Sequence, residues 1–351
     1  MTATVAATKT ARPASDGGFP PVAITMGEPA GIGGEIMLKA WLDRGRGLPT
    51  FFAIDDEARL AALAGRLKFA VPLRAIASPG EAQAVFAKAL PVLPIALGGE
   101  PKPGKPDPAN AQAVIASIET AVRLTMAGAA AAVVTNPIHK ATLYDAGFRY
   151  PGHTEFLAAL AGIRTPPVMM LAAAELRVVP VTVHLSLKEA LARLTTDAIV
   201  QAGEITAKAL RRDFGIAKPR LAVAGLNPHA GESGALGSEE ASIIRPAVAR
   251  LKDAGIDAVG PLAPDAMFAP AARKGYDAAL CMYHDQALIP IKAIAFDSAV
   301  NVTLGLPFVR TSPDHGTAFD IAGTGKASAT SLMAALDLAA ALAHRRARQT
   351  A

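Results

Sequence analysis

The chain has 351 residues, of which 51% are hydrophobic and 19% are charged. This composition supplies a sizeable apolar core and excludes an intrinsically disordered chain. The formal net charge is +5, but one of these charges falls in residues 1–19 and three belong to Arg345, Arg346 and Arg348. The body of the chain is nearly neutral and shows no interleaving of basic and aromatic residues, so we expect no nucleic-acid partner.

The first nineteen residues and the single cysteine indicate the compartment. Residues 1–19 lack the apolar core of about 7–15 residues that a secretory signal needs, and their small and polar composition predicts a disordered extension. A transit peptide is the alternative, because acidic residues are scarce there. Cys281 excludes an internal disulfide and fits a reducing, cytoplasmic location. No run of about 18 apolar residues is free of charge or proline, so we expect no membrane span.

Apolar strands and helical patterns alternate along the chain. Strands are predicted at residues 21–26, 50–54, 131–134, 168–171, 177–183, 220–224 and 278–283, and helices at 35–41, 109–126, 196–214, 239–255 and 328–346. The proline-rich segment 98–108 is predicted to be a loop, because proline fits neither a helix interior nor a central strand. This alternation predicts an α/β fold with a largely parallel sheet and helices on its faces.

Three of the seven histidines share one context. His184, His229 and His284 each follow an apolar strand, either directly or in the next turn. Ligands of open α/β sheets bind at the carboxyl ends of strands, so three imidazoles placed this way can converge on one divalent ion such as zinc or cobalt. Three histidine ligands also leave an open coordination position. The alternative is that each is a half-buried histidine at a strand end.

Other polar residues point to an anionic ligand. His153 and Thr154 lie in a turn that opens a helix, where N–H groups and a hydroxyl suit an anion or a carbonyl oxygen. The alternative is that Thr154 simply caps the helix. His139 and Lys140 follow another strand, and they either reach the same site or lie on a solvated helix start.

The stretch after residue 278 is dense in functional side chains. Beyond His284 it carries two cations and an amide, at Lys292, Arg310 and Asn301. A packed core has little use for such residues, whereas a site for an anionic ligand requires them.

Two glycine-rich turns compete as the cofactor site. Residues 31–36 fail the dinucleotide fingerprint because Ile36 replaces its last glycine, although Asp55 lies where a ribose-binding acid would stand in a Rossmann fold. The second turn contains His315, Gly316, Thr317 and Asp320. It combines flexible backbone with a carboxylate that can accept hydrogen bonds from ribose hydroxyls.

Residues 315–323 resemble the cofactor loop of the β-decarboxylating dehydrogenases of the isocitrate and isopropylmalate type, with Thr317 and Phe319 as the departures. From Pro21 almost to its end, the chain resembles the 4-hydroxythreonine-4-phosphate dehydrogenase family of vitamin B6 biosynthesis. The matching blocks are GEPAGIG (27–33), GHTEF (152–156), GLNPHAGE (225–232), MYHDQ (282–286), residues 299–312 and DHGTA (314–318).

The resemblance implies an isocitrate/isopropylmalate dehydrogenase-like α/β fold, a two-domain αβα sandwich with a cleft between the domains. Residues 20–130 and 305–351 are expected to form a cofactor-side domain. Residues 131–304 are expected to form a domain for metal, substrate and dimerisation. The resemblance also implies a homodimer whose active site is shared between the subunits.

The implied reaction is oxidation of 4-phosphooxy-L-threonine by NAD or NADP, followed by decarboxylation to 3-amino-2-oxopropyl phosphate. One divalent ion (zinc, magnesium or cobalt) is implied per site. The implied roles are metal binding for His184, His229 and His284; substrate binding for His153, Thr154, Lys292, Asn301 and Arg310; and cofactor binding for His315, Gly316, Thr317 and Asp320. His153 or Lys292 is expected to move the proton. Asp285 and Asp265 are candidates for orienting the ligating imidazoles, although Asp265 could instead cap a helix.

Alternatives remain open at this point. A paralogue acting on threonate or erythronate 4-phosphate, or on a cis-dihydrodiol carboxylate, keeps the chemistry and changes the substrate. A metal-dependent binding module without catalysis is an alternative of another class, which the three histidines and two cations disfavour. Asp320 favours NAD because it would repel a 2′-phosphate, whereas the nearby Lys326 works against this preference.

Overall fold

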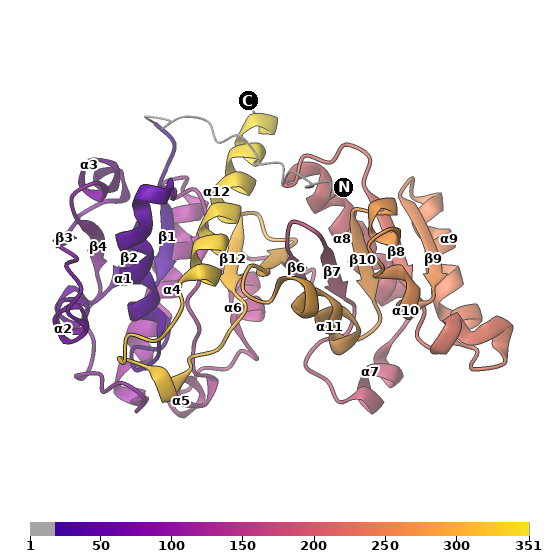
Figure 1. Cartoon of the computed structure of the whole chain (residues 1–351), viewed down its shortest axis with the longest axis horizontal. Helices are drawn as coiled ribbons and strands as arrows, with labels where there is room; N and C mark the ends of the chain where they lie inside the picture. Colours follow the sequence, from indigo (N-terminus) through magenta and orange to yellow (C-terminus); the bar gives the residue numbers. More distant parts are fainter. Residues whose placement is uncertain (1–17, 351) are drawn as a thin grey trace, which may run out of the picture.

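The computed structural model describes residues 18–350, so almost all of the predicted extension 1–19 lies outside the described residues. The described chain forms a twelve-stranded sheet with the order β3-β4-β2-β1-β5-β12-β11-β6-β7-β10-β8-β9. Figure 1 shows the N-terminal strands at one end of the molecule and β8 and β9 toward the other. The strands are β1 (Val22–Thr25), β2 (Phe51–Asp55), β3 (Leu73–Ala75), β4 (Leu90–Pro94), β5 (Val133–Val134), β6 (Val168–Ala172), β7 (Arg177–Pro180), β8 (Arg220–Ala224), β9 (Asp257–Leu262), β10 (Ala278–Cys281), β11 (Val300–Leu304) and β12 (Arg310–Pro313).

The two outer parts of the sheet are parallel, as the sequence predicts, and the centre is not. Strand β11 pairs antiparallel with both β12 and β6, and β6 pairs antiparallel with β7. The strands β11 and β12, which form a hairpin, were not predicted from the sequence. Strand β12 gave no signal because it reads Arg-Thr-Ser-Pro, with no apolar run. The α/β class is confirmed, with a mixed sheet in place of a largely parallel one.

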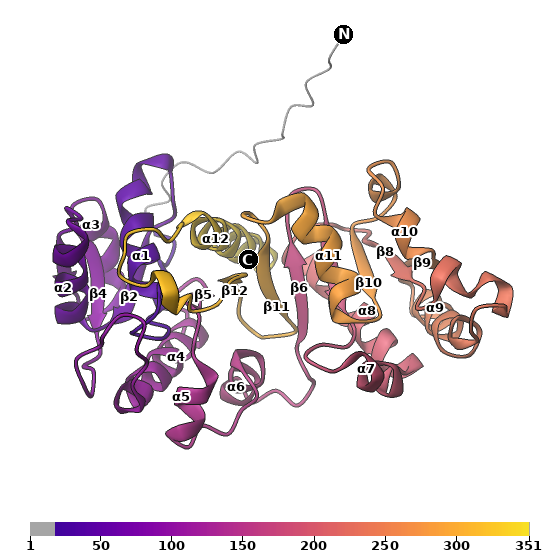
Figure 2. The same ribbon diagram turned by 60° about the horizontal axis from the view of Figure 1, so that its bottom comes forward.

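Helices cover both faces of the sheet (Figures 1 and 2). They are α1 (Gly33–Leu42), α2 (Glu57–Leu67), α3 (Ala82–Phe86), α4 (Ala111–Met126), α5 (Lys140–Asp145), α6 (His153–Leu160), α7 (Leu187–Arg193), α8 (Thr196–Arg212), α9 (Arg245–Asp253), α10 (Pro264–Met267), α11 (His284–Ala295) and α12 (Thr330–Thr350). Apolar residues of α1, α8, α9 and α12 share one continuous core with the sheet. On the opposite face, α4 and α6 form one core and α10 and α11 form another.

The central strands present polar residues to the face between those two separate cores. Val300 and Val302 of β11 pack in the core that includes α12. Side chains alternate along a strand, so Asn301 and Thr303 point to the opposite face. On β12, Thr311 donates to a carbonyl of α12 (Ala335) and its neighbour Arg310 points away from that helix. The fold therefore gathers Asn301 and Arg310 on one face of the sheet.

The long predicted helices at 109–126, 196–214 and 328–346 correspond to α4, α8 and α12. The predicted helix 239–255 divides into a π-helical turn, Glu240–Ile244, followed by α9. No helix among residues 18–350 has the length and apolar character needed to cross a lipid bilayer. The predicted division at residues 130 and 304 stays a prediction: the sheet runs through both parts, and β5 pairs with β1 and β12.

Candidate active site

Arg310 is the most deeply buried cation among the predicted substrate residues, with 4% of its surface exposed. Its Nη1 donates to Thr303 Oγ1 at 2.9 Å and its Nη2 donates to Thr135 Oγ1 at 2.5 Å. The Nε has no hydrogen-bond partner among residues 18–350. Burial lowers the pKa of the guanidinium to about 10, which leaves it charged at neutral pH. A buried charge held by hydroxyls alone is costly, so this position is suited to an anionic ligand.

His153 lies beside this arginine. It is the first residue of α6, and its Nε2 is buried without a partner in the described chain. Burial lowers the pKa of the imidazole well below its ordinary value, and the positive charges of Arg310 and Lys140 lower it further. His153 is therefore neutral at pH 7. It can offer a lone pair or a single N–H to a ligand at the same face.

The start of α6 decides between the two interpretations of Thr154. Gly152 occupies the capping position, and no side chain caps this helix. Thr154 stands inside the first turn, half-buried, one residue after His153. The alternative that Thr154 caps the helix is therefore wrong, and its hydroxyl is not used as a cap.

Lys140 acts electrostatically on the region of His153. A methyl group added at Gly152, the cap of α6, would lie 3.5 Å from Lys140 Nζ. The positive charge of Lys140 acts on both His153 and His184, lowering the pKa of each imidazole. Lys140 is the exposed first residue of α5, as the solvated-helix-start alternative expects, and its charge also acts on two of the predicted site histidines.

Lys292 is the second cation among the predicted substrate residues. It lies on α11, where its Nζ forms an ion pair with Asp314 Oδ2 at 2.9 Å. Asp314 directly follows β12, so this pair ties α11 to the strand that carries Arg310. On the neighbouring strand β11, Asn301 is half-buried and pairs with Ser312 of β12. In the sequence, Asp314 belongs to the DHGTA block, and nothing local indicates its ion pair with Lys292.

Two of the three predicted metal ligands are neighbours. The rings of His184 and His284 lie with their centroids 6.1 Å apart. His284 Nδ1 is 2.7 Å from Asp285 Oδ1, so Asp285 orients this imidazole as predicted. The pKa of His184 is lowered by partial burial and by the charges of Lys140 and His284, which favours the neutral, ligating form. Asp265 lies in the first turn of α10.

His229 lies in an unusual turn after β8. Residues 229–233 all have positive φ, between 43° and 78°, and only one of them is glycine. Left-handed backbone costs roughly 1–2 kcal/mol for each non-glycine residue. Such strain persists only where the surroundings impose it, and it is often found at functional sites. Among residues 18–350, no group of three or more His, Cys, Asp or Glu side chains is arranged to hold a metal ion.

Glu240 imposes this turn. Its carboxylate accepts hydrogen bonds from the backbone N–H groups of Leu226 and Asn227 at 2.8 and 2.7 Å, and from Asn227 Nδ2 at 3.0 Å. Glu240 is only 3% exposed and begins the π-helical turn before α9. A side chain on Gly231 would meet its Oε2 at 2.6 Å. The strand end, the turn and Glu240 therefore fix where His229 stands. The sequence alone does not indicate this role of Glu240, because it does not show which glutamates are buried.

The predicted cofactor loop follows β12 and Asp314. His315 is half-buried, with Nδ1 3.0 Å from Gly316 O and Nε2 without a partner in the described chain. Asp320 is exposed in a short 3₁₀ turn, Phe319–Ile321. Thr317 faces the glycine-rich turn after β1, because its carbonyl accepts a hydrogen bond from Ile32 N at 3.1 Å. The two glycine-rich turns that competed as cofactor sites are thus in contact.

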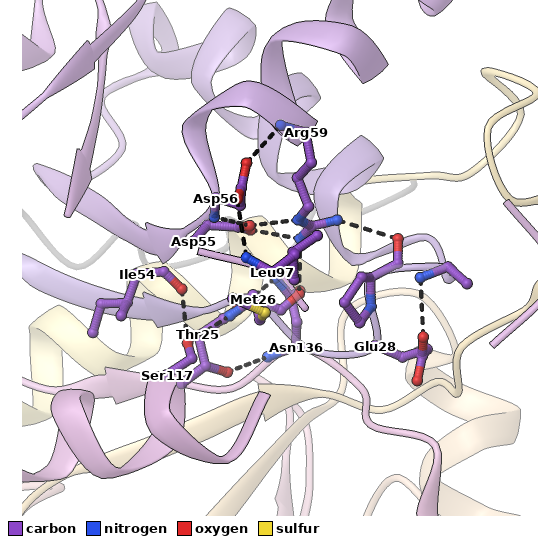
Figure 3. Close-up of polar contacts among 12 residues, drawn as sticks. Thr25, Met26, Glu28, Ile54, Asp55, Asp56, Arg59, Leu97, Ser117 and Asn136 are labelled. Atoms are coloured by element: carbon purple, nitrogen blue, oxygen red, sulfur yellow. Dashed lines mark hydrogen bonds and ion pairs between the residues drawn. The ribbon is translucent and has the colours of Figure 1, made fainter. Parts of the chain in front are cut away.

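Asp55 is not available to a ribose, so the Rossmann alternative is wrong. It ends β2 as predicted, but its side chain is 0% exposed and both carboxylate oxygens bind Arg59 (Figure 3). The pair spans one turn at the start of α2, where Asp56 caps the helix by accepting from Arg59 N. A ligand cannot reach the carboxylate without breaking this pair.

A buried arginine on β12 acts electrostatically on a neutral imidazole, and a lysine is paired with the aspartate that links β12 to a glycine-rich loop. This arrangement is typical of an α/β enzyme that acts on a small anionic substrate. Residues 48–339 match the family described as pyridoxal phosphate biosynthetic protein PdxA, and the chain belongs to this family. The resemblance predicted from the sequence is confirmed.

Individual relatives agree with this assignment. The chain is 57% identical over 334 residues to a 4-hydroxythreonine-4-phosphate dehydrogenase of Bradyrhizobium diazoefficiens, covering 92% of this chain and 97% of that one. A crystal structure of a 4-hydroxythreonine-4-phosphate dehydrogenase from Klebsiella pneumoniae is 38% identical with a TM-score of 0.83, covering 92% and 99% of the two chains. A terephthalate 1,2-cis-dihydrodiol dehydrogenase structure from Burkholderia xenovorans is 29% identical with a TM-score of 0.61, covering 91% and 97%.

Proposed function

We propose that this chain oxidises 4-phosphooxy-L-threonine with NAD or NADP and decarboxylates the product to 3-amino-2-oxopropyl phosphate, in pyridoxal 5′-phosphate biosynthesis. Its curated relatives carry the name of this dehydrogenase. The observation that carries the proposal is Arg310, a buried guanidinium whose Nε lacks a partner among residues 18–350. An anionic phosphate or carboxylate supplies the missing charge and acceptor.

The site residues fit the steps of this reaction. The substrate hydroxyl loses a proton, its carbon loses a hydride to the nicotinamide, and the resulting β-keto acid loses carbon dioxide. Neutral His153 can accept a proton or a hydrogen bond through Nε2, while Lys292 carries the positive charge that a carboxylate or phosphate needs. Lys292 also has protons to donate to the carbanion that decarboxylation leaves. Thr154 and Asn301 supply uncharged hydrogen-bonding groups beside these cations.

We also propose that the site binds one divalent ion, which is zinc, cobalt or magnesium. The imidazoles of His184 and His284 are adjacent, and imidazole nitrogen suits zinc or cobalt better than magnesium. His229 is the proposed third ligand. When bound, the ion would supply a Lewis acid at the substrate oxygen. The residues of this chain fit such an ion in donor chemistry, and Asp285 adds the supporting carboxylate that ligating histidines need.

A homodimer with a shared site is the proposed assembly. Helix α11 begins with His284 and carries Lys292, and the same helix exposes Ile289 to 67%, with Phe296 just beyond its end exposed to 71%. Large apolar side chains next to a polar site favour coverage by a second copy of the chain. The proposal includes the division into a cofactor-side part (20–130 and 305–351) and a metal and substrate part (131–304). A cytoplasmic location also remains a proposal.

The test is direct. Purified protein with a divalent metal is given NAD⁺ or NADP⁺ and 4-phosphooxy-L-threonine, and absorbance at 340 nm is followed. Reduced cofactor and 3-amino-2-oxopropyl phosphate are expected. If threonate or erythronate 4-phosphate is turned over far faster, the chain is a paralogue with that substrate, and the proposed substrate is wrong. Turnover of a dihydrodiol carboxylate instead would place the chain with its relative from Burkholderia xenovorans. Metal binding without any cofactor reduction on this panel would favour the binding module.

Cofactor preference has its own test. Exposed Asp320 would repel the 2′-phosphate of NADP, so NAD is the proposed cofactor. Asp320→Asn should raise the ratio of kcat/KM for NADP to that for NAD. An unchanged ratio would remove Asp320 from cofactor selection.

A further inference from the structure

Arg59 makes a two-pronged ion pair that is almost sealed from solvent. Its Nε lies 2.5 Å from Asp55 Oδ1 and its Nη2 lies 2.6 Å from Asp55 Oδ2. The two side chains are 4% and 0% exposed. Figure 3 shows the guanidinium between the end of β2 and the turn that follows β1. A buried ion pair of this kind contributes little to stability compared with apolar packing, so a role beyond stability would lie in the other contacts of Arg59.

The remaining donors of Arg59 bind that turn. Nη1 donates to Pro29 O at 3.2 Å and Nη2 donates to Met26 O at 3.4 Å. Both carbonyls belong to the glycine-rich turn 26–31, which leads from β1 into α1 (Figure 3). Arg59 thus binds the backbone of this turn, and Asp55 holds the guanidinium in the orientation that these hydrogen bonds require.

The turn is tied down from its other side as well. Glu28 N donates to Pro137 O at 2.8 Å, and Ala30 N donates to Glu28 Oε1 at 3.0 Å. Gly27, with φ +66°, packs so closely on Asn136 that an added methyl would lie 2.7 Å from its Cβ. The turn therefore has one conformation, fixed by β2 on one side and by the segment after β5 on the other.

This rigid turn supports the predicted cofactor loop. Ile32 N donates to Thr317 O at 3.1 Å, and a methyl group added at Gly31 would lie 3.0 Å from the same oxygen. The proline-rich loop makes a second connection. Gly104 N donates to Ala30 O at 2.8 Å, and a methyl on Gly104 would lie 2.9 Å from Phe319 O. Two carbonyls of residues 315–320 thus rest against glycines whose positions the turn determines.

We propose that Asp55 and Arg59 are positioning residues for the dinucleotide: they fix the turn 26–31, and the turn fixes the backbone of residues 315–320. The inference rests on the proposed function, because it assumes that this loop binds the cofactor. It assigns the turn 26–31, which overlaps the first glycine-rich turn at Gly31, a role that the dinucleotide fingerprint does not describe. The turn supports the backbone of the cofactor loop. In this proposal, neither Asp55 nor Arg59 contacts the cofactor. Loss of the pair therefore weakens dinucleotide binding and spares the anion site at Arg310, which stands on β12 and donates its hydrogen bonds to Thr303 and Thr135.

The experiment compares two ligands in four proteins: the unaltered chain, Arg59→Met, Arg59→Lys and Arg220→Met. Dissociation constants for NADH, by fluorescence, and for inorganic phosphate, by calorimetry, are measured separately. Arg220→Met is the matched control, since it removes an Arg–Asp pair with two contacts to Asp277 at the far part of the sheet. We expect Arg59→Met to raise the Kd for NADH at least tenfold, with the Kd for phosphate within twofold of the unaltered chain. Arg59→Lys should recover part of the loss, and Arg220→Met should change neither constant.

Gly31→Ala keeps the inference open to test if Arg59→Met fails to fold. Its methyl group presses on Thr317 without altering the buried pair, and we expect the same selective loss of NADH binding. Hydrogen exchange of residues 315–323 should speed up in both variants. An unchanged Kd for NADH in Arg59→Met or in Gly31→Ala, or an equal loss for both ligands, would overturn the inference while leaving the proposed function intact. If the unaltered chain binds no dinucleotide at all, the proposed function fails and takes this inference with it.

Discussion

Lys292 of α11 and Asp314, the residue after β12, form an ion pair in which Nζ lies 2.9 Å from Oδ2. The lysine side chain is 35% exposed and the aspartate side chain 15%. The pair joins the helix that begins at His284 to the strand that begins at Arg310. Lys292 is therefore held in place before any substrate arrives, so little conformational entropy is lost when an anion binds.

Removing the amine should abolish the chemistry and spare the fold. We expect Lys292→Met to lower kcat/KM for the phosphorylated substrate about a hundredfold or more, the range for loss of a proton-transfer group. Asp314→Asn should have a smaller effect of the same sign, because the amine remains but is no longer oriented. Steady-state kinetics on both variants provide the check, with the remote lysine variant Lys252→Met as the control. Full activity in Lys292→Met would exclude this residue from catalysis.

Arg310→Met should affect binding and stability in opposite directions. Loss of the guanidinium should weaken phosphate binding about 10- to 100-fold, since hydrogen bonds to charged groups contribute roughly 1.5–3 kcal/mol. The ligand-free variant should be at least as stable as the unaltered chain, because a buried cation without a carboxylate partner is removed. Calorimetric titration with phosphate and urea unfolding measure the two effects. A large fall in stability would show that Arg310 serves the core and not a ligand.

Acid should destabilise the folded protein through His153. Its pKa in the folded chain is far below the unfolded value of 6.5, because of burial and the charges of Arg310 and Lys140. As the pH falls below 6.5, the unfolded chain takes up a proton that the folded chain refuses. The stabilisation that is present above pH 6.5 is therefore lost progressively as the pH falls toward the folded pKa, by at most about 1.4 kcal/mol per pH unit.

The measurement is urea unfolding at pH 7.5 and pH 5.0, with His153→Asn as the comparison. The difference in free energy of unfolding between the two pH values should be larger for the unaltered chain than for this variant. Equal differences would mean that His153 titrates alike in both states.

The turn that carries His229 should depend on Glu240. Glu240→Leu leaves two backbone N–H groups without their acceptor, so we expect a loss of about 2–3 kcal/mol in the free energy of unfolding. Gly231→Ala should act through the same contact, since its methyl would meet Glu240 Oε2 at 2.6 Å. Gly234→Ala is the matched control: it also has positive φ, at +101°, but its methyl would meet nothing within 4 Å.

The separating measurement is the affinity for zinc or cobalt. It should fall in Glu240→Leu and Gly231→Ala and stay close to the original in Gly234→Ala. If all three variants bind the ions alike, the turn does not position a metal ligand.

Parts of the site could be predicted because their signals are local. His184 and His284 follow predicted strands, and the glycine-rich turns are visible as composition. Asp314 and Glu240 lacked such signals, because their roles depend on partners in other segments of the chain. Asp55 misled for the same reason: its position at the end of β2 was correct, but Arg59 occupies both its oxygens.

By itself the sequence determined the α/β class, the family and the helices α1, α4, α8, α9 and α12, because these follow from hydrophobic periodicity and from contiguous motifs. Only the tertiary structure decided the antiparallel centre of the sheet, where β11 and β12 turn Asn301 and Arg310 toward one face. Only the tertiary structure showed that Arg310 is buried without a carboxylate partner among the described residues. It also showed that the two glycine-rich turns are in contact. Burial and long-range hydrogen bonds are properties of the packed chain, since they depend on which segments meet and not on what each segment prefers alone.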